Sequence, residues 1–319
     1  MEKRILTFSR ISWLLLCLFL VALAAPAQNE VTPVNGDVNS DNEVSIADVN
    51  TVIDIIFNGG TYNAAADVNH DSEINIADVN AIIGLILDGQ SSHIKTFTVG
   101  GVSFNMVEVE GGTFKSIHSP QVTLSPFAIG QTEVTQALWE AVMGSNPSYF
   151  NGDSRPGGPD NPVEEVSWDD CQEFIAKLNE MTGRTFRLPS EAEWEFAARG
   201  GNYSHGYKYA GSDNLDDVAI YEPQSTLFVR TSFPNELGLY EMSGSMWEWC
   251  QDWFGPYGSE PLVNPVGPES GTYRVIRGGC YLWTDPTFCR VSYRTGIDPA
   301  TDNSNIDLRL VMDDNTSKK

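Results

Sequence analysis

Two cysteines in the C-terminal part of the sequence, Cys280 and Cys289, are the first candidates for chemistry. They lie nine positions apart in RGGCYLWTDPTFCRVSYR, residues 277–294. Thiolates are nucleophiles and soft metal ligands, so two of them can hold Cu(I) or take part in redox chemistry. Two cysteines can equally cross-link a fold. Cys171 and Cys250 also follow residue 27, and these four cysteines allow three different pairings.

A repeated acidic pattern supplies a second set of candidate ligands. Residues 36–60 and 66–90 share the form D-x-N-x-D-x-E-x-[SN]-x-x-D at a spacing of 30 residues. Alternate side chains with oxygen atoms can surround Ca²⁺, which takes roughly six to eight oxygen ligands. The sequence therefore predicts two calcium loops. Their ligands are Asp37, Asn39, Asp41, Glu43 (through its carbonyl), Ser45 and Asp48, and in the second loop Asp67, Asn69, Asp71, Glu73, Asn75 and Asp78.

These loops depart from the EF-hand pattern at two positions. Position 6 is Asn42 or Ser72 instead of Gly, and position 12 is Asp instead of Glu. Apolar residues at helical spacing predict one amphipathic helix after each loop. Residues 28–92 contain 11 acidic and no basic residues, so we expect folding to depend on calcium. The alternative is a solvated acidic linker, which does not need this periodicity.

The N-terminal residues 1–27 predict export. Lys3, Arg4 and Arg10 precede an apolar run of 13 residues, WLLLCLFLVALAA, and APA at 25–27 fits cleavage after small residues. An uncleaved membrane anchor is the alternative, although the run is short for a bilayer. Because residues 1–27 hold one acidic and three basic residues, their removal changes the net charge from −24 to −26. We expect a secreted or extracytoplasmic protein, in the periplasm or at the cell surface, that binds no nucleic acid and has no membrane span after signal removal.

The second part of the sequence predicts a mixed domain over residues 104–312. Residues 91–103 suggest a linker running into a strand, and 313–319 a tail. Alternation of apolar and polar residues in FNMVEVEGGTF predicts a strand. Three helices are predicted from a capping residue at the start and a glycine at the end, namely Thr135 to Gly144, Ser167 to Gly183 and Ser190 to Gly200.

The two loops, each followed by a single helix, resemble a dockerin module over residues 35–90. Dockerins bind cohesin modules, so the resemblance implies a cohesin-like partner. The equivalent recognition positions are Ile46, Ala47, Ile76 and Ala77, which are the same in both repeats and would let either face dock. The alternative is that these residues pack against the following domain.

Longer motifs in residues 104–312 resemble the sulfatase-modifying-factor family, which includes the formylglycine-generating enzymes. They are, in order, MVEVEGGTF, SPFAIGQTEVT, PVEEVSW, RLPSEAEWEFAARGG, NELGLYEMSGSMWEWCQDW, RVIRGGCY, and CRVSYR with NIDLRLV. The resemblance implies an α+β, C-type-lectin-like domain with much irregular structure. The complete protein would then combine this domain with a small all-α dockerin-like module that carries two EF-hand-type calcium loops.

The resemblance implies copper-dependent oxidation of a cysteine in a sulfatase or peptide, but the catalytic cysteines are not matched. In the enzymes, a Gly-Gly-Ser segment precedes two cysteines spaced five residues apart. Here Cys280 replaces that serine, Trp283 stands at the first catalytic position and Phe288 at the second. We therefore expect a non-catalytic protein that binds a peptide, glycan or protein. The alternatives are a copper-dependent oxidase that uses Cys280 and Cys289, and a variable display scaffold built on the loops of 280–305.

The resemblance also implies how the cysteines pair. Family members often tie the helix that contains Cys171 to the strand that contains Cys289. Cys250 and Cys280 would then be neighbours, either bonded to each other as the second pair or free. With the thiols held in such cross-links, a copper centre could not assemble.

A further calcium site in the large domain follows from the same resemblance. The segment LYEMSGSMWEW is similar to a structural calcium site whose ligands would be Glu241, the carbonyls of Gly244 and Met246, and Glu248. Glutamates that are satisfied by hydrogen bonds are the alternative. The expected cofactors are thus two calcium ions in the dockerin-like module and one more in the large domain, with copper only in a catalytic protein.

Aromatic residues predict either a core or a ligand groove in the C-terminal part of the chain. Large side chains exclude water from a domain rich in loops, and exposed ones stack on sugars or hold peptides. We select Trp247, Tyr281, Trp283 and Asp285 as candidate ligand-binding residues. Four arginines are expected to pair with the abundant acids, namely Arg277, Arg290, Arg294 and Arg309.

Overall fold

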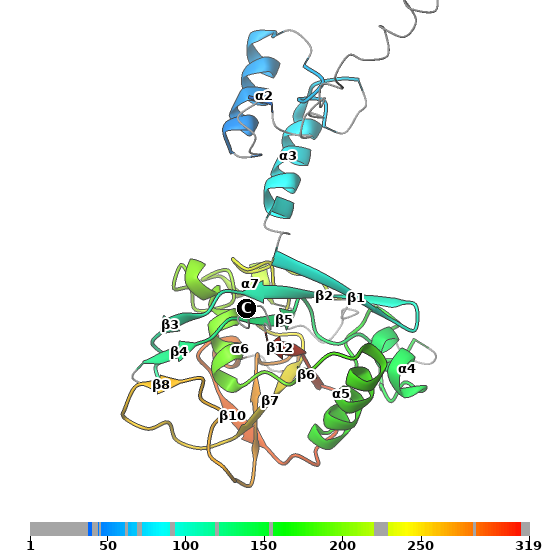
Figure 1. Ribbon diagram of the computed structural model, residues 1–319, viewed down its shortest axis with the longest axis vertical. Coiled ribbons are helices and arrows are strands. Elements are labelled where there is room, and N and C mark those ends of the chain that lie inside the picture. Colours follow the sequence, from blue (N-terminus) through cyan, green and yellow to red (C-terminus); the bar gives the residue numbers. More distant parts are fainter. Residues whose placement is uncertain are drawn as a thin grey trace, which may run out of the picture. The chain divides into compact units, whose positions relative to one another are not determined.

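The computed structural model describes residues 38–39, 44, 46–60, 63–68, 72–89, 93–118, 121–152, 156–219, 229–282 and 285–313. Two compact units divide the chain, Met1–Ser92 and His93–Lys319 (Figure 1). The predicted export segment 1–27 lies outside the described residues, as do Asp37, Asp41, Glu43, Ser45, Asn69, Asp71 and Trp283. No helix within the described ranges is long and apolar enough to cross a membrane.

The first unit contains two helices, α2 (Ile46–Asn58) and α3 (Ile76–Gly89), which pack against each other. Each begins directly after one of the acidic loops, as predicted. One small core holds them together, consisting of Val38, Val49, Val52, Ala66, Val68, Val79 and Ile82. The apolar positions of both helices recur at helical spacing, so a single buried stripe on each helix suffices to form this core.

Three sheets build the described part of the second unit. The first has the order β1 (Ile94–Val99), β2 (Val102–Val109), β5 (Phe127–Gly130), β12 (Val311–Asp313) and β6 (Phe186–Arg187). The second has the order β10 (Thr295–Ile297), β9 (Arg274–Arg277), β7 (Trp247–Trp253) and β11 (Ile306–Leu308). The third has the order β3 (Gly112–Phe114), β4 (Val122–Leu124) and β8 (Leu262–Val263). The pairs β7–β11 and β4–β8 are parallel, and the other pairs are antiparallel.

The predicted linker at 91–103 runs into a strand almost at once, because β1 and the start of β2 occupy residues 94–103. These two strands form a hairpin, in which Ile94 is paired with Val107 and Val99 with Val102. Phe97 stacks on Phe104 and packs edge-on against Phe186 at a ring-centroid distance of 5.3 Å. These aromatic contacts join the hairpin to the domain, so the second unit begins at His93 and not at residue 104.

Three longer helices, α4 (Gln136–Met143), α5 (Trp168–Thr182) and α6 (Glu191–Ala198), begin at the predicted capping residues. Ser167 forms a capping box with Asp170, and Ser190 forms one with Glu193. Such reciprocal bonds satisfy N–H groups that have no partner inside the helix. Figure 1 shows α4 and α5 together at the β1–β2 hairpin, in agreement with their contacts. The remaining helical turns are η2 (Gly201–Tyr203), α7 (Leu215–Val218) and η3 (Pro286–Cys289).

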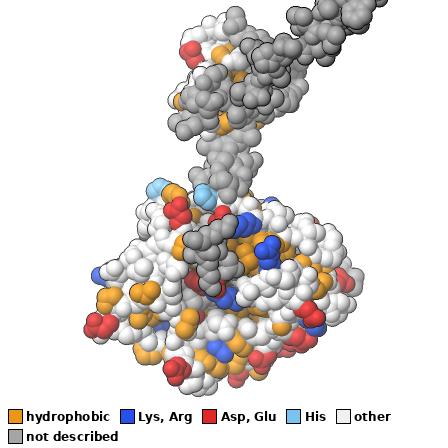
Figure 2. All heavy atoms as spheres, viewed as in Figure 1, with side chains coloured by type: hydrophobic (Ala, Val, Ile, Leu, Met, Phe, Trp, Pro, Cys, Tyr) orange, Lys and Arg blue, Asp and Glu red, His pale blue; other side chains and the backbone are white. Residues whose placement is uncertain are grey.

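The first two sheets are connected through a short segment near the end of the domain. β11 lies at the edge of the four-stranded sheet, and β12 lies between β5 and β6 in the five-stranded sheet. Arg309 and Leu310 separate these strands, and both are buried. On the outside, acidic side chains are spread over the visible face of the second unit and do not gather in one patch (Figure 2).

Candidate functional site

The two predicted calcium loops contain the same backbone closure. The Asp48 Oδ1 atom accepts a hydrogen bond from Val38 N at 2.7 Å, and the Asp78 Oδ1 atom accepts one from Val68 N at 2.8 Å. Both carboxyl groups are fully buried and lie in the first turn of α2 and α3. In each repeat, the carboxyl group at loop position 12 thus accepts a hydrogen bond from the backbone N–H at loop position 2. This bond holds the two ends of the loop together, as a cation-binding loop needs.

The second loop also shows why position 6 matters. Ser72 has φ 71°, in the left-handed region that glycine adopts most easily. Its backbone N–H donates to Asp67 Oδ2 at 2.9 Å, and Asp67 is almost completely buried. The turn predicted from the loop pattern is thus made by a serine, at a conformational cost.

The predicted recognition residues in the described part of the first unit face outward. Ala47, Ile76 and Ala77 are exposed, and two thirds of the Ile76 surface is accessible (66%). The side chain of Ile46 lies outside the described set. These exposures leave the predicted recognition positions accessible from solvent.

The predicted disulfides are not formed in the structure. The thiols of Cys171, Cys250 and Cys289 are free, so neither Cys171–Cys289 nor Cys250–Cys280 exists. The reason is that the two cysteines of each predicted pair lie in different hydrophobic cores. Cys171 and Cys280 lie in the core that contains Trp249, Cys250 lies in the core around Trp194, and Cys289 packs with Tyr209 and Leu215.

Burial favours the protonated form of three of the described thiols. Burial, together with the neighbouring Cys280, raises the pKa of Cys289 to about 12. Burial also raises the pKa values of Cys171 and Cys250 well above the ordinary value. Cys280 is fully buried, and its Sγ atom accepts a hydrogen bond from Asn305 Nδ2 at 3.4 Å. Cys280 and Cys289 are close in space, but their burial does not fit a copper ion that must bind thiolates and meet a peptide substrate.

Of the predicted ligand-binding residues, Trp247 belongs to the core. Its ring packs against Phe288 and Tyr293, and only 5% of its surface is exposed. Asp285 is exposed, but it caps η3 by accepting a hydrogen bond from Thr287 N at 2.9 Å. This bond lowers the pKa of the Asp285 carboxyl group. Both residues therefore have structural roles.

Tyr281 takes part in a feature that the sequence did not indicate. Tyr149, Phe150 and Tyr281 form an aromatic row, with ring centroids 4.9 Å apart for the first pair and 6.1 Å for the second. Tyr149 is exposed and Tyr281 is mostly buried, while the adjacent Leu282 is half exposed at 52%. The aromatic row and Leu282 together present apolar surface around a loop, where the sequence pattern gave no signal.

Glu164 lies beneath the aromatic row. Its Oε1 atom accepts a hydrogen bond from Phe150 N at 2.7 Å, which fixes the backbone below the exposed tyrosine. Burial raises the pKa of Glu164 to about 7. The carboxyl group therefore titrates near neutral pH.

The structure does not favour the calcium site predicted from LYEMSGSMWEW. The Glu241 carboxylate accepts N–H groups of Arg230, Thr231 and Ser232. The Glu248 carboxylate is bound through both oxygens by Arg309, and Trp194 Nε1 donates to it at 2.7 Å. Both carboxylates are thus committed to hydrogen-bond donors. In the described ranges, no group of three or more His, Cys, Asp or Glu side chains is arranged to hold a metal.

The predicted pairing of arginines with acids is confirmed for three of the four residues. Arg277 pairs with Glu195 at 2.7 Å, Arg294 with Glu191 at 2.6 Å and Arg309 with Glu248 at 2.7 Å. Arg290 is exposed and begins the turn after η3.

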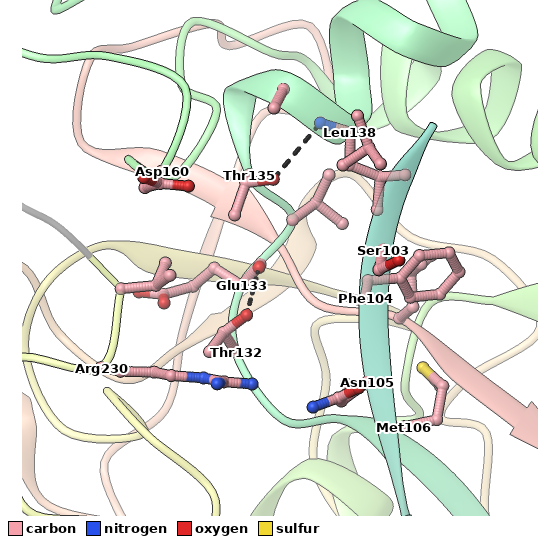
Figure 3. A pocket seen from close by; sticks show the side chains of 16 residues that line it. Ser103, Phe104, Asn105, Met106, Thr132, Glu133, Thr135, Leu138, Asp160 and Arg230 are labelled. Carbon is pink, nitrogen blue, oxygen red and sulfur yellow. Dashed lines mark hydrogen bonds between the residues drawn. The ribbon is translucent and has the colours of Figure 1, made fainter. Parts of the chain in front are cut away.

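A pocket of about 420 Å³ lies beside β2 and the start of α4 (Figure 3). Its polar wall contains Asn105, Thr132, Glu133, Asp160 and Arg230. Arg230 donates to Gln131 Oε1, which also accepts a hydrogen bond from Asn105 Nδ2 at 3.1 Å. The sequence analysis did not identify this pocket, because its walls come from segments as distant as Ser103 and Leu310.

The fold and these sites define a modular protein in which a unit with two helices precedes a mixed α/β domain. The sulfatase-modifying factor enzyme 1-like domain matches residues 92–314, and the chain belongs to this family. A dockerin type I domain matches residues 35–87. Dockerin domains bind calcium and typically dock onto cohesins.

Several known proteins are similar to this chain. The chaperone protein LppX of Paenibacillus barcinonensis is 34% identical over 239 residues, which cover 57% of this chain and 80% of that one. The formylglycine-generating enzyme of Streptomyces coelicolor is 37% identical over 179 residues, covering 49% and 54%, so the chain spans about half of that enzyme.

Solved structures show the same fold. Treponema denticola variable protein 1 matches with a TM-score of 0.64 and 33% identity, over 69% of this chain and 99% of that one. PvdO from Pseudomonas aeruginosa matches with a TM-score of 0.54 and 26% identity, over 66% and 94%.

Proposed function

We propose that this protein is an exported, non-catalytic binding protein. Its dockerin module would anchor it to a cohesin-like partner in a calcium-dependent manner, and its second unit would present a ligand surface. Burial of Cys280 and Cys289 is the observation that carries the non-catalytic assignment. The acidic composition and the dockerin domain support a location outside the cytoplasm.

The proposed ligand surface consists of the aromatic row and Leu282. The exposed Tyr149 ring supplies a flat face for stacking, and its hydroxyl group supplies a hydrogen bond. Phe150 contacts that ring edge-on, and Tyr281 in turn contacts Phe150 edge-on. Such a surface suits a sugar ring or an apolar side chain of a peptide.

Oxygen consumption and thiol accessibility test the non-catalytic assignment. The native chain, supplied with Cu(I) and a cysteine-containing peptide, is expected to consume no oxygen. A thiol reagent should not react with the native chain, but it should titrate Cys171, Cys250, Cys280 and Cys289 after unfolding. Oxygen uptake that disappears in a Cys280→Ser variant would instead establish the copper-dependent oxidase.

Binding to arrays of glycans and peptides tests the ligand surface. Tyr149→Ala and Leu282→Ala are expected to abolish capture of any ligand that the native chain retains. Tyr203→Ala is the matched control, because Tyr203 is similarly exposed (52%) but lies on η2. Equal loss in all three variants, or in none, would rule out this surface.

A further inference from the structure

Two buried carboxylates in the second unit have no hydrogen-bond donors. Glu133 is 2% exposed and Asp307 is fully buried. All four of their carboxylate oxygens lack a hydrogen-bond partner within the part of the chain that the structure describes. Removing a carboxylate from water costs several kcal/mol unless a positive charge, a donor or a proton compensates. These four oxygens therefore require an explanation.

The backbone brings the two residues together from distant parts of the sequence. Glu133 follows β5, and the next residue, Val134, donates its N–H to Leu308 O at 2.9 Å. Asp307 is the residue before Leu308 and is paired with Glu248 across β7 and β11. The two carboxyl groups interact electrostatically, and each has a pKa well above its ordinary value, mainly because of burial.

Arg309 is the nearest positive charge, and its N–H groups are already used. Its Nε and Nη2 atoms bind both oxygens of Glu248, at 2.7–3.1 Å. Nη1 donates to Gly130 O at 3.0 Å and Nη2 to Tyr240 O at 2.9 Å. The Glu133 carboxylate remains 4.0 Å from Nη2, at the limit of an ion pair. One guanidinium group thus faces the charges of Glu133, Glu248 and Asp307.

We propose that Glu133 and Asp307 bind one hard divalent cation, Ca²⁺, between them. Two carboxylates supply four oxygen ligands, and carbonyl groups, water or a hydroxyl complete a sphere that takes roughly six to eight. A donor set made only of oxygen selects Ca²⁺ or Mg²⁺ over softer metals. The site differs from the one predicted at Glu241 and Glu248, whose oxygens are occupied by N–H donors.

The pocket beside β2 gives the ion a route from solvent. Glu133 is one of its lining residues and lies between Thr132 and Thr135 at the pocket wall (Figure 3). The pocket wall therefore includes the residue that carries one of the two carboxylates, although its oxygens are shielded from solvent. A binding site needs such an entry path in addition to its ligands.

Luminescence of Tb³⁺, a Ca²⁺ analogue, tests the proposal in the full chain. Residues 28–92 contain no tryptophan, so emission excited through tryptophan reports ions bound near the second unit's tryptophans and not ions in the dockerin loops. Trp194 donates to Glu248, the strand neighbour of Asp307, and is thus a nearby sensitiser. We expect saturable emission that Ca²⁺ competes away. Glu133→Gln and Asp307→Asn should each weaken Tb³⁺ binding at least tenfold.

Control variants separate this site from its alternatives. Asp252 on β7 is another buried carboxylate with one oxygen that lacks a hydrogen-bond donor. The variant Asp252→Asn is therefore the control and should leave the Tb³⁺ emission unchanged. If the emission is lost in Glu241→Gln but kept in Asp307→Asn, the ion binds at the site predicted around Glu241 and Glu248, and the proposal is wrong. Absence of saturable emission from the native chain would also overturn it and would indicate that the carboxyl groups hold protons. The circular dichroism spectrum and melting temperature in chelator verify that each variant is folded.

Discussion

Replacement of the buried Arg309 by methionine is expected to destabilise the second unit by about 3–5 kcal/mol. Arg309 and Glu248 have no exposed side-chain surface, and the guanidinium group also binds the carbonyls of Gly130 and Tyr240. Methionine fills a similar length but leaves Glu248 as a buried charge with only the Trp194 N–H as a donor. The desolvation cost of that charge, rather than the loss of one attractive contact, sets the size of the effect.

Urea unfolding followed by tryptophan fluorescence measures this change, because residues 28–92 contain no tryptophan. Lys177→Met is the control: Lys177 pairs with Glu173 one helical turn away, and its side chain is 43% exposed. That exposed pair should contribute only about 0.3–0.5 kcal/mol. The double variant Arg309→Met with Glu248→Met should recover much of the lost stability. A loss below about 1 kcal/mol in Arg309→Met, or no recovery in the double variant, would refute the reasoning.

Three further predictions concern the loops and a titrating core residue. Asp48→Ala should weaken calcium binding and reduce the helical circular dichroism at low calcium, with tryptophan fluorescence unchanged, because Val38 N and Asn39 N lose their acceptor. Ser72→Gly should raise the melting temperature of the calcium-loaded first unit, since a left-handed serine costs about 1 kcal/mol. Burial raises the pKa of Asp252 to about 7, so the folded state retains a proton there that the unfolded chain releases near pH 4, and stability should fall as pH rises from about 4 to 7. Asp252→Asn should flatten this dependence and gain roughly 4 kcal/mol above pH 7 in urea unfolding, whereas an unchanged pH profile would contradict the assignment.

Local signals in the sequence predicted local structure well. The helices α4, α5 and α6 begin at Thr135, Ser167 and Ser190, because a capping side chain acts within three residues of its own position. The repeat likewise predicted α2 and α3 and the acidic loops before them. The strand that follows the predicted linker begins earlier than expected, at Ile94, and its Phe97 obtains a ring partner from the distant Phe186.

Long-range features of the site were not predictable in this way. The sequence analysis placed the cysteines in cross-links, and the structure distributes them over separate cores. Burial of Cys280 and Cys289, and not a pair of disulfides, is what disfavours copper chemistry in the structure. Nothing in the local sequence of Glu133 or Asp307 indicates that they meet, because they are 174 positions apart and are joined by the contact of Val134 with Leu308.

The position of β11 and β12 has a consequence for biosynthesis. The ribosome synthesises β11 and β12 after all other strands of the four-stranded and five-stranded sheets, and each of these two sheets contains one of them. The domain therefore cannot complete its fold stepwise during translation, and a nascent chain that ends before Ile306 remains incompletely folded. In the exported protein proposed above, this delay would keep the chain in the form that a translocation channel accepts.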